Sequence, residues 1–314
     1  QVNKDLIIDA GKTGVEIALL EDKRLVELHQ GNSESTHLVG DIYLGQVKKL
    51  LPGLNAAFID VGSKKDGFLH YLDLGLYYKA LEKFTKICMS GGGDSMDFAK
   101  LKEPKLEKSG KIVETLKQGQ VILVQVSKEA ISTKGPRLCT EISFAGRYLV
   151  LVPFSEKVSV SQKIKSAEER NRLRKLIKSI KPDNFGIIIR TIAEGKSVAE
   201  LDADLKDLLS KWESIKKKLP KALPPTKLVS ELDKSSVILR DMLTEEFNNV
   251  YVNDADLYEE LKGYISSICP EKEDILHLYK MQTPIFEQFG VASQIRNSFG
   301  KVVTIRSGIY LIIE

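Results

Sequence analysis

Two phenylalanines stand where a β-strand would turn them away from its apolar face. Side chains alternate along a strand, so Phe58 falls on the same face as Asp60 in the run 55–61. Phe68 falls on the more polar face of the run 67–71 by the same alternation. Aromatic rings exposed on neighbouring strands suit stacking on unpaired nucleic-acid bases, a contact that contributes about 1–3 kcal/mol per base.

Two lysines later in the chain could neutralise the phosphates of the same nucleic acid. Lys128 and Lys134 follow the predicted strand 120–126, and ammonium groups close to phosphates supply much of the affinity of such complexes. The alternative is that one or both phenylalanines belong to a core, where aromatic residues are common, and that the lysines are only solvated. The sequence pattern leaves both interpretations open.

An arginine and a threonine at the end of a predicted strand, Arg190 and Thr191, have the chemistry of a phosphate site. A guanidinium fork beside a hydroxyl suits a terminal phosphate, although a surface arginine and a turn threonine would look the same. Gly146 and Val150 flank the start of an earlier strand. A glycine there permits close approach by a ligand, or it only marks a bulge.

No catalytic centre is visible, and we predict neither a catalytic residue nor a metal site in this chain. The 4 histidines and 3 cysteines lack metal-ligand spacing. A P-loop, a dinucleotide fingerprint and a nucleophile elbow are all missing from the sequence. Asp202, Asp204 and Asp207 share a predicted helix, and we expect them on its solvated side.

Composition narrows the class of protein. The 314 residues are 42% hydrophobic and 29% charged, which is typical of soluble globular proteins and excludes disordered, collagen-like and disulfide-stapled chains. Apolar runs such as 148–152 are too short to cross a bilayer, no secretory signal is visible, and the scattered cysteines indicate a reducing cytoplasm. The net charge of +4 permits a nucleic-acid partner without requiring one.

Five short β-like runs separated by turn residues predict a small closed barrel of the OB kind. The runs are 41–50, 55–61, 66–71, 120–126 and 137–144. The interruption at 74–117 contains a serine followed by three glycines at 90–93, and we expect it to be partly helical and partly mobile. An antiparallel meander of strands is expected before the barrel, within residues 6–29.

The stretch after the barrel alternates strands and helices. Strands are expected at 148–152 and 185–190, and each precedes a helix opened by a Ser-x-x-Glu capping box: Ser166 with Glu169, and Ser197 with Glu200. The basic residues of 170–178 are expected to form a solvated face. The apolar residues at helical spacing in the second helix are Leu201, Leu205, Leu208, Trp212 and Ile215. The proline-rich run 219–225 indicates a linker.

The last part of the chain predicts further mixed structure. Helices are expected at 239–247, 257–268 and 284–299, with a strand at 250–252. The runs 302–305 and 309–313 read as a hairpin around Ser307-Gly308. A domain seldom ends on an apolar strand with nothing after it to complete the layer, so we expect the chain to be truncated.

The order of several longer motifs resembles a known family. The run 40–69, GDIYLGQVKKLLPGLNAAFIDVGSKKDGFL, is similar to the OB barrel of the bacterial ribonuclease E/G family. The runs 132–153, 158–164 and 187–201 resemble the 5′-sensor region of that family, in the same order. The resemblance covers essentially the whole chain, and the residues of its motifs are more similar to the ribonuclease G branch than to the ribonuclease E branch.

The resemblance implies an α+β, multidomain architecture. An RNase H-like subdomain, formed by 1–36 and 232–298, would carry an inserted OB-fold barrel at 37–140 with its own insertion at 74–117. An α/β 5′-sensor domain would follow at 141–231, and 299–314 would begin a DNase-I-like catalytic domain. These boundaries are expectations from the resemblance.

The resemblance also implies an endoribonuclease that cuts single-stranded, AU-rich RNA, prefers a 5′-monophosphate, and acts in rRNA processing and mRNA decay. It assigns RNA contacts in the barrel to Phe58, Phe68, Lys128 and Lys134. It assigns the 5′-phosphate to Arg190 and Thr191, and the terminal nucleotide to Gly146 and Val150. The partner is therefore expected to be single-stranded RNA, with no membrane, and the full-length protein is expected to be a homo-oligomer.

Two departures from the family pattern bear on these expectations. Leu44 stands where the family often has a basic residue, so we expect this chain to lack one of the family's RNA contacts. The family's magnesium-binding carboxylates and the cysteines that bridge subunits through zinc would lie beyond Glu314. We therefore expect this chain to bind and position RNA, with magnesium needed only by the full-length enzyme. The alternative is a stand-alone, non-enzymatic RNA-binding regulator, which a reading frame that stops after Glu314 would favour.

Overall fold

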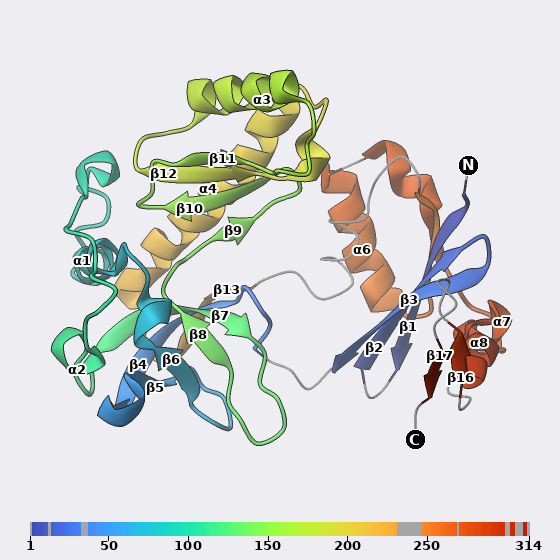
Figure 1. Ribbon diagram of the computed structural model, residues 1–314, viewed down its shortest axis with the longest axis horizontal. Helices are drawn as coiled ribbons and strands as arrows, with labels where there is room; N and C mark the ends of the chain where they lie inside the picture. Colours follow the sequence, from blue (N-terminus) through green and yellow to red (C-terminus); the bar gives the residue numbers. More distant parts are fainter. Residues whose placement is uncertain are drawn as a thin grey trace. The chain divides into compact units, whose positions relative to one another are not determined.

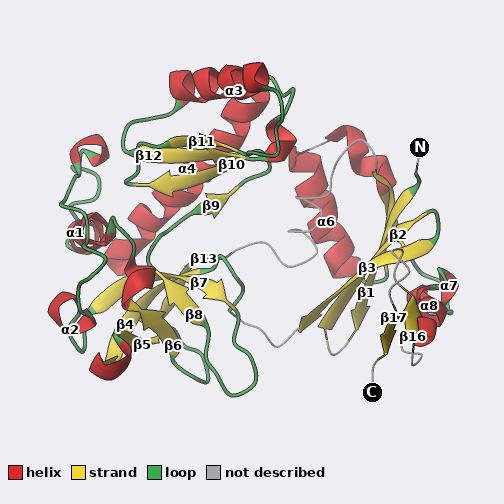
Figure 2. Cartoon of the chain, in the orientation of Figure 1, coloured by secondary structure: helices red, strands yellow, loops and turns green. Residues whose placement is uncertain are grey.

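A computed structural model of the chain describes residues 2–11, 14–32, 37–230, 247–268, 270–298, 302–304 and 310–312 (Figure 1). Helices and strands are mixed throughout (Figure 2). The chain divides into two compact units: the first joins Gln1–Glu34 to Leu232–Glu314, and the second is Ser35–Glu231. The second unit is therefore inserted into the first, and each unit is described by itself below.

Five strands of the second unit close into a barrel. They are β4 (Ile42–Leu51), β5 (Ala56–Asp60), β6 (Gly67–His70), β7 (Val121–Lys128) and β8 (Arg137–Cys139). Their order is β4-β5-β6-β8-β7, and a pairing of β4 with β7 closes the ring. Strands β6 and β8 pair in parallel, whereas the other barrel pairs are antiparallel. This topology is consistent with an OB-like fold, and the predicted five-stranded barrel is confirmed.

The last predicted strand of the barrel, 137–144, and the segment after the predicted linker differ from the sequence prediction. The predicted strand 137–144 was wrong as a single element, because β8 stops at Cys139 and Phe144–Ala145 forms β9 in another sheet. Thr140 anchors the crossing: its backbone N–H donates to the Asp73 carbonyl at 2.9 Å and its buried hydroxyl donates to the Leu74 carbonyl. After the predicted linker, β13 (Thr226–Val229) adds to the barrel beside β4, a strand that the sequence did not predict.

The insertion at 74–117 contains the helices α1 (Tyr78–Met89) and α2 (Ile112–Thr115). Its aromatic side chains pack against the following α/β region, where the Phe84 and Trp212 rings stack at 4.4 Å. The amide of Asn184 also donates to the Phe98 carbonyl at 2.7 Å. The helical part of the insertion is confirmed, it joins the barrel and the α/β region in one core, and its expected mobility stays a prediction.

The α/β region is a four-stranded sheet covered by two helices on one face. Its strands are β9, β10 (Leu149–Pro153), β11 (Val158–Val160) and β12 (Phe185–Ile189), in the order β11-β12-β10-β9. The helices α3 (Ala167–Ile180) and α4 (Val198–Lys218) lie beside this sheet (Figure 1). They share a core with alternate residues of β10 and β12. The predicted apolar stripe of α4 is confirmed, because all five of its residues are buried.

The first unit is built on a five-stranded mixed sheet. Its strands are β1 (Lys4–Gly11), β2 (Gly14–Glu21), β3 (Arg24–Asn32), β14 (Phe247–Val252) and β15 (Leu276–Leu278), in the order β15-β14-β1-β2-β3. The predicted N-terminal meander is confirmed, and β14 and β15 add in parallel to β1. Helix α6 (Ala255–Ile268) packs on one face of the sheet, and α7 (Ile285–Gln288) and α8 (Val291–Ser298) pack on the other.

Three predictions for the end of the chain have different outcomes. The helix predicted at 284–299 was wrong as one element, because the chain turns at Gly290 (φ +70°) between α7 and α8. The strands β16 (Val302–Thr304) and β17 (Tyr310–Ile312) pair antiparallel, although the turn at Ser307-Gly308 lies outside the described residues. Nearly all of the helix predicted at 239–247 also lies outside them. The names RNase H-like subdomain and 5′-sensor stay predictions.

Candidate nucleic-acid interface

The two phenylalanines are direct neighbours on the outside of the barrel. Phe58 of β5 and Phe68 of β6 are register partners, and their rings meet edge to face at 6.2 Å and 69°. Both rings are half-buried, whereas Ile59 and Leu69, next to them in the chain, have 0% exposure. The sheet alternation therefore directs the rings away from the barrel core, as the sequence predicts.

Strand register extends this pair into a row across the barrel. Lys49 of β4 pairs with Phe58, and Arg137 of β8 pairs with Phe68. Lys128 of β7 pairs in turn with Arg137. We call these five residues the barrel strip. All three basic side chains are exposed, so two aromatic rings lie between cationic groups, as stacking of bases and neutralisation of phosphates require.

Sequence analysis missed two members of the strip, Lys49 and Arg137. Lys49 meets Phe58 through a bulge between Val47 and Lys49, and Arg137 meets Phe68 through the parallel pairing of β8 with β6. Hydrophobic alternation within each strand was the only signal that could have indicated their outward direction. The side chain of Arg137 is held in place by Asp73, whose Oδ2 accepts from Nε at 3.1 Å and from Nη2 at 3.0 Å.

Lys134 lies in the loop that connects Lys128 to Arg137. The loop turns tightly, since the Lys134 N–H donates to the Ile131 carbonyl at 3.0 Å, and Lys134 is exposed. The N–H of Phe68 donates to the Pro136 carbonyl at 2.9 Å and ties the end of the loop to β6. The structure therefore places Lys134 in a loop fastened to the phenylalanine strand, beside the strip and outside it.

The four residues predicted for the RNA terminus gather where β10 and β12 pair. Val150 is the register partner of Ile188, and the Arg190 N–H donates to the Tyr148 carbonyl at 2.8 Å. Gly146 precedes β10, and Thr191 follows Arg190 directly. We call Gly146, Val150, Arg190 and Thr191 the end site. Val150 lies on the sheet face opposite the helices, next to Ile188, which is 45% exposed.

Arg190 is oriented by backbone carbonyls. Its Nη1 donates to the Gly146 carbonyl at 2.7 Å and to the Arg147 carbonyl at 3.3 Å. Thr191 is exposed, and its hydroxyl bonds the Ser161 hydroxyl at 2.8 Å. A half-buried guanidinium and an exposed hydroxyl thus stand side by side at one strand end, a pair that can receive a phosphate.

The group that closely approaches Gly146 in the structure is a carboxylate of the protein. A Cβ at Gly146 would lie 2.5 Å from Oδ1 of Asp204 on α4. Asp204 accepts three backbone N–H groups, from Arg147 at 3.1 Å and from Tyr148 and Leu149 at 2.9 Å. The requirement for glycine is thereby explained by internal packing, and the contact to a terminal nucleotide stays a prediction.

The expectation that Asp204 is solvated was wrong. Burial raises the pKa of its carboxyl above the ordinary value, and the three backbone N–H groups lower it in part. Asp204 lies at the edge of the apolar stripe of α4, directly before the fully buried Leu205. That position at the stripe edge was the signal in the sequence, but it does not reveal which backbone the carboxylate meets.

Two further basic side chains lie beside the end site. Arg147 and Lys196 both lie over the Tyr148 ring, with their charged groups 5.2 and 5.7 Å from its centroid. Tyr148 itself is buried at 6% exposure. A phosphate arriving at Arg190 would therefore meet a cationic surface whose basic side chains are already ordered by an aromatic ring.

The described residues form neither a candidate metal cluster nor a membrane-spanning helix. Within the described ranges, no group of three or more His, Cys, Asp or Glu side chains could hold a metal ion. The described residues thus do not fit the magnesium ion that the resemblance implies, and no reaction step is derived through it. Among the same ranges, no helix is long and apolar enough to span a membrane.

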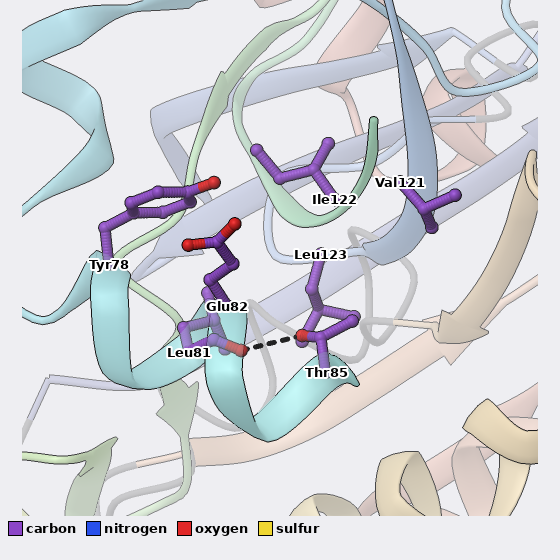
Figure 3. Close-up of a pocket in the computed structure, with 7 residues that line it drawn as sticks. All are labelled: Tyr78, Leu81, Glu82, Thr85, Val121, Ile122 and Leu123. Carbon is purple, nitrogen blue, oxygen red and sulfur yellow. Dashed lines mark hydrogen bonds between the residues drawn. The ribbon is translucent and has the colours of Figure 1, made fainter. Parts of the chain in front are cut away.

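A small pocket lies between α1 and β7 (Figure 3). Its polar groups are already bonded within the protein. Gln120 Nε2 donates to the Tyr78 hydroxyl at 2.9 Å and to Glu82 at 3.1 Å, and the Thr85 hydroxyl donates to the Leu81 carbonyl at 2.8 Å. Its lining residues include none of the predicted site residues. The candidate interface therefore consists of the barrel strip, the loop that carries Lys134 and the end site.

Comparison with known proteins gives consistent matches. Residues 143–314 match the Ribonuclease E/G family. Ribonuclease G of Haemophilus influenzae is 34% identical over 310 residues, which are 99% of this chain and 60% of that protein. Ribonuclease G of Escherichia coli is 33% identical with the same coverage. Ribonuclease E of Nostoc sp. is 36% identical over 283 residues, 88% of this chain and 37% of that protein. The chain thus spans about 60% of the ribonuclease G relatives.

Proposed function

Because the chain belongs to the ribonuclease E/G family, we propose that it binds and positions RNA for a ribonuclease G-type RNA-processing endoribonuclease. The single observation that carries the proposal is the barrel strip. Its five residues come from five different strands, and strand pairing brings two aromatic rings between three basic groups. A row of this kind suits a nucleic-acid strand whose bases stack and whose phosphates meet the cations.

The strip favours single-stranded RNA over a duplex. Phe58 and Phe68 can stack only on bases whose faces are open, and in a duplex those faces are covered by neighbouring base pairs. The β5–β6 face and the loop that carries Lys134 are also the surfaces that OB folds use for oligonucleotides. A preference for AU-rich segments, and roles in rRNA processing and mRNA decay, belong to the same proposal.

The end site is proposed to select RNA with a 5′-monophosphate. Arg190 would meet the phosphate with its guanidinium and Thr191 with its hydroxyl, while Val150 would contact the terminal nucleotide. The cationic groups around Tyr148 support this assignment. In the whole enzyme, assembled as a homo-oligomer, a magnesium ion would supply the hydrolytic chemistry. The residues of this chain bind the strand and orient it.

A binding comparison tests the proposal. Two RNAs of one AU-rich sequence, labelled at the 3′ end, would carry a 5′-monophosphate or a 5′-hydroxyl, and fluorescence anisotropy would give both dissociation constants. We expect the chain to prefer the monophosphate and Arg190→Ala to lose most of that preference. Arg174→Ala is the control, since Arg174 on α3 bonds only Asn171 among the contacts found for it. An equal loss of affinity for both RNAs in Arg190→Ala would contradict the 5′-end assignment.

A further inference from the structure

The same Ser-x-x-Glu motif begins both helices of the α/β region, but only the copy at α4 forms both hydrogen bonds of a capping box. At α4, the Glu200 carboxylate accepts the Ser197 N–H at 2.9 Å, and the Ser197 hydroxyl accepts the Glu200 N–H at 3.3 Å. At α3, the Ser166 hydroxyl accepts the Glu169 N–H at 3.2 Å. The box at α4 has both bonds, whereas at α3 only the Ser166 bond is present, because the Glu169 carboxylate points elsewhere.

Glu169 reaches the loop that carries the end site. Its Oε1 accepts the Gly195 N–H at 2.8 Å. The same carboxylate forms a bidentate pair with Arg172, with Nε and Nη2 both at 2.7 Å. Arg172 Nη2 also donates to the Lys196 carbonyl at 3.0 Å. The pair therefore bonds one N–H and one carbonyl of consecutive loop residues, although the Arg172 side chain is still 39% exposed, as a solvated face predicts.

The loop 190–196 is held near its start by the buried Ala193 and by the bond of the Thr191 hydroxyl to Ser161. Its residues Thr191–Ala193 form the turn η4, and Gly195 has φ +74°, which favours glycine. The backbone bonds in this segment run mostly between loop residues, from Ala193 to Arg190, from Glu194 to Thr191 and from Lys196 to Ala193. At the other end of the loop, the Glu169–Arg172 pair connects Gly195 and Lys196 to helix α3.

The charge of the Glu169 carboxylate beside the end site is balanced by Arg172. A bare carboxylate beside a phosphate site would repel the phosphate, but the bidentate arginine neutralises it. The hydrogen bonds from Arg172, and then the Gly195 N–H, lower the pKa of Glu169 to about 2. The pair therefore stays ionised at neutral pH, and the stability it contributes is lost only as the pH falls from about 4.5 toward 2.

We propose that Glu169 and Arg172 are positioning residues for the 5′ end of RNA. They hold the loop 190–196 so that Thr191 and Lys196 stand where a terminal phosphate meets Arg190. Neither side chain needs to touch the RNA. This inference rests on the proposed function of the end site, and it adds that selection of the phosphate depends on a helix whose basic side chains look like ordinary surface residues.

The test compares affinities for the 5′-monophosphate and 5′-hydroxyl RNAs described above. We expect Glu169→Ala to reduce the monophosphate preference by about three- to tenfold, the effect of one or two lost hydrogen bonds, with unchanged affinity for the hydroxyl RNA. Arg172→Ala should reduce it further, because it leaves an unpaired negative charge beside the site. Glu169→Gln keeps an acceptor for the Gly195 N–H and should retain part of the preference.

Glu213→Ala is the matched control, because it breaks an acid–base pair of the same i,i+3 spacing, with Lys216 at 2.8 Å on α4. It should leave the preference unchanged. A folded Glu169→Ala that keeps the wild-type preference, or that weakens both RNAs equally, overturns the inference while Arg190→Ala still supports the end site. If Glu169→Ala does not fold, Glu169→Gln decides in the same way. If the unsubstituted chain shows no preference, the proposed end site and this inference both fail.

Discussion

The barrel strip and the end site are assembled in different ways. Barrel strands carry the strip, and sheet register aligns its residues across the bulges that precede Lys49 and Lys128. Apart from Val150 in strand β10, the end site lies on two irregular segments, one held by Asp204 of α4 and the other by Glu169 of α3. Side chains of the strip should therefore be removable one at a time, whereas the end site should depend on carboxylates that never touch RNA.

The physical reason lies in the backbone. Strand hydrogen bonds are made by main-chain groups, so an exposed strand side chain can change while the ladder stays intact. A turn has no such ladder, and its N–H groups need acceptors from elsewhere. At residues 147–149, one carboxylate supplies the acceptors for three consecutive N–H groups. Loss of that group removes three hydrogen bonds together.

The largest effect is expected from Asp204→Ala. Three N–H groups lose their acceptor, and at about 1–3 kcal/mol for each unsatisfied buried group the free energy of unfolding should fall by roughly 3 kcal/mol or more. Urea unfolding would measure it. Asp204→Asn, which keeps an amide oxygen, should lose less, and Asp207→Ala, one turn further on an exposed position, should lose little. An unchanged urea midpoint for Asp204→Ala would show that the end site does not depend on this carboxylate, and the proposed difference between the two regions would be wrong.

Phe58→Ala should have a large effect on binding and a small one on stability. Loss of one stacking ring should weaken single-stranded RNA by about 1–3 kcal/mol, measured by anisotropy, while the thermal midpoint stays nearly constant. Phe84→Ala is the matched control, because Phe84 has 0% exposure and stacks on Trp212. That substitution should cost about 3–5 kcal/mol of stability. A similar fall in midpoint for Phe58→Ala would show that its ring is structural.

The smallest effect is expected from Lys49→Ala. One lost phosphate contact should reduce the slope of log affinity against log salt by about 0.7 for a single strand, with no change in unfolding. Titrations at several salt concentrations would measure the slope. Lys79→Ala, an exposed lysine on α1 away from the strip, should leave it unchanged. Equal slopes for Lys49→Ala and the unsubstituted chain would show that Lys49 does not contact a phosphate. The strip would then consist of Phe58, Phe68, Arg137 and Lys128.

Much of the fold was predictable because its signals are local. Alternation within short runs predicted the barrel strands and the outward faces of Phe58 and Phe68, and helical spacing predicted the buried stripe of α4. The prediction failed where a distant partner decides the structure. Strand β13 exists because β4 offers it a pairing edge. The run 137–144 divides because Thr140 bonds residues 73 and 74, far away in the chain.

The sequence by itself determined the family, the barrel, the four residues of the end site and three of the five strip residues, because periodicity and ordered motifs are properties of neighbouring residues. Only the tertiary structure decided which of those residues act together. Two identical Ser-x-x-Glu motifs show the difference. The Glu200 carboxylate accepts the N–H of Ser197 at the start of its own helix, whereas the Glu169 carboxylate accepts the N–H of Gly195, 26 residues away in a loop. A carboxylate binds the N–H groups that folding brings within reach, and that choice depends on packing of the whole region.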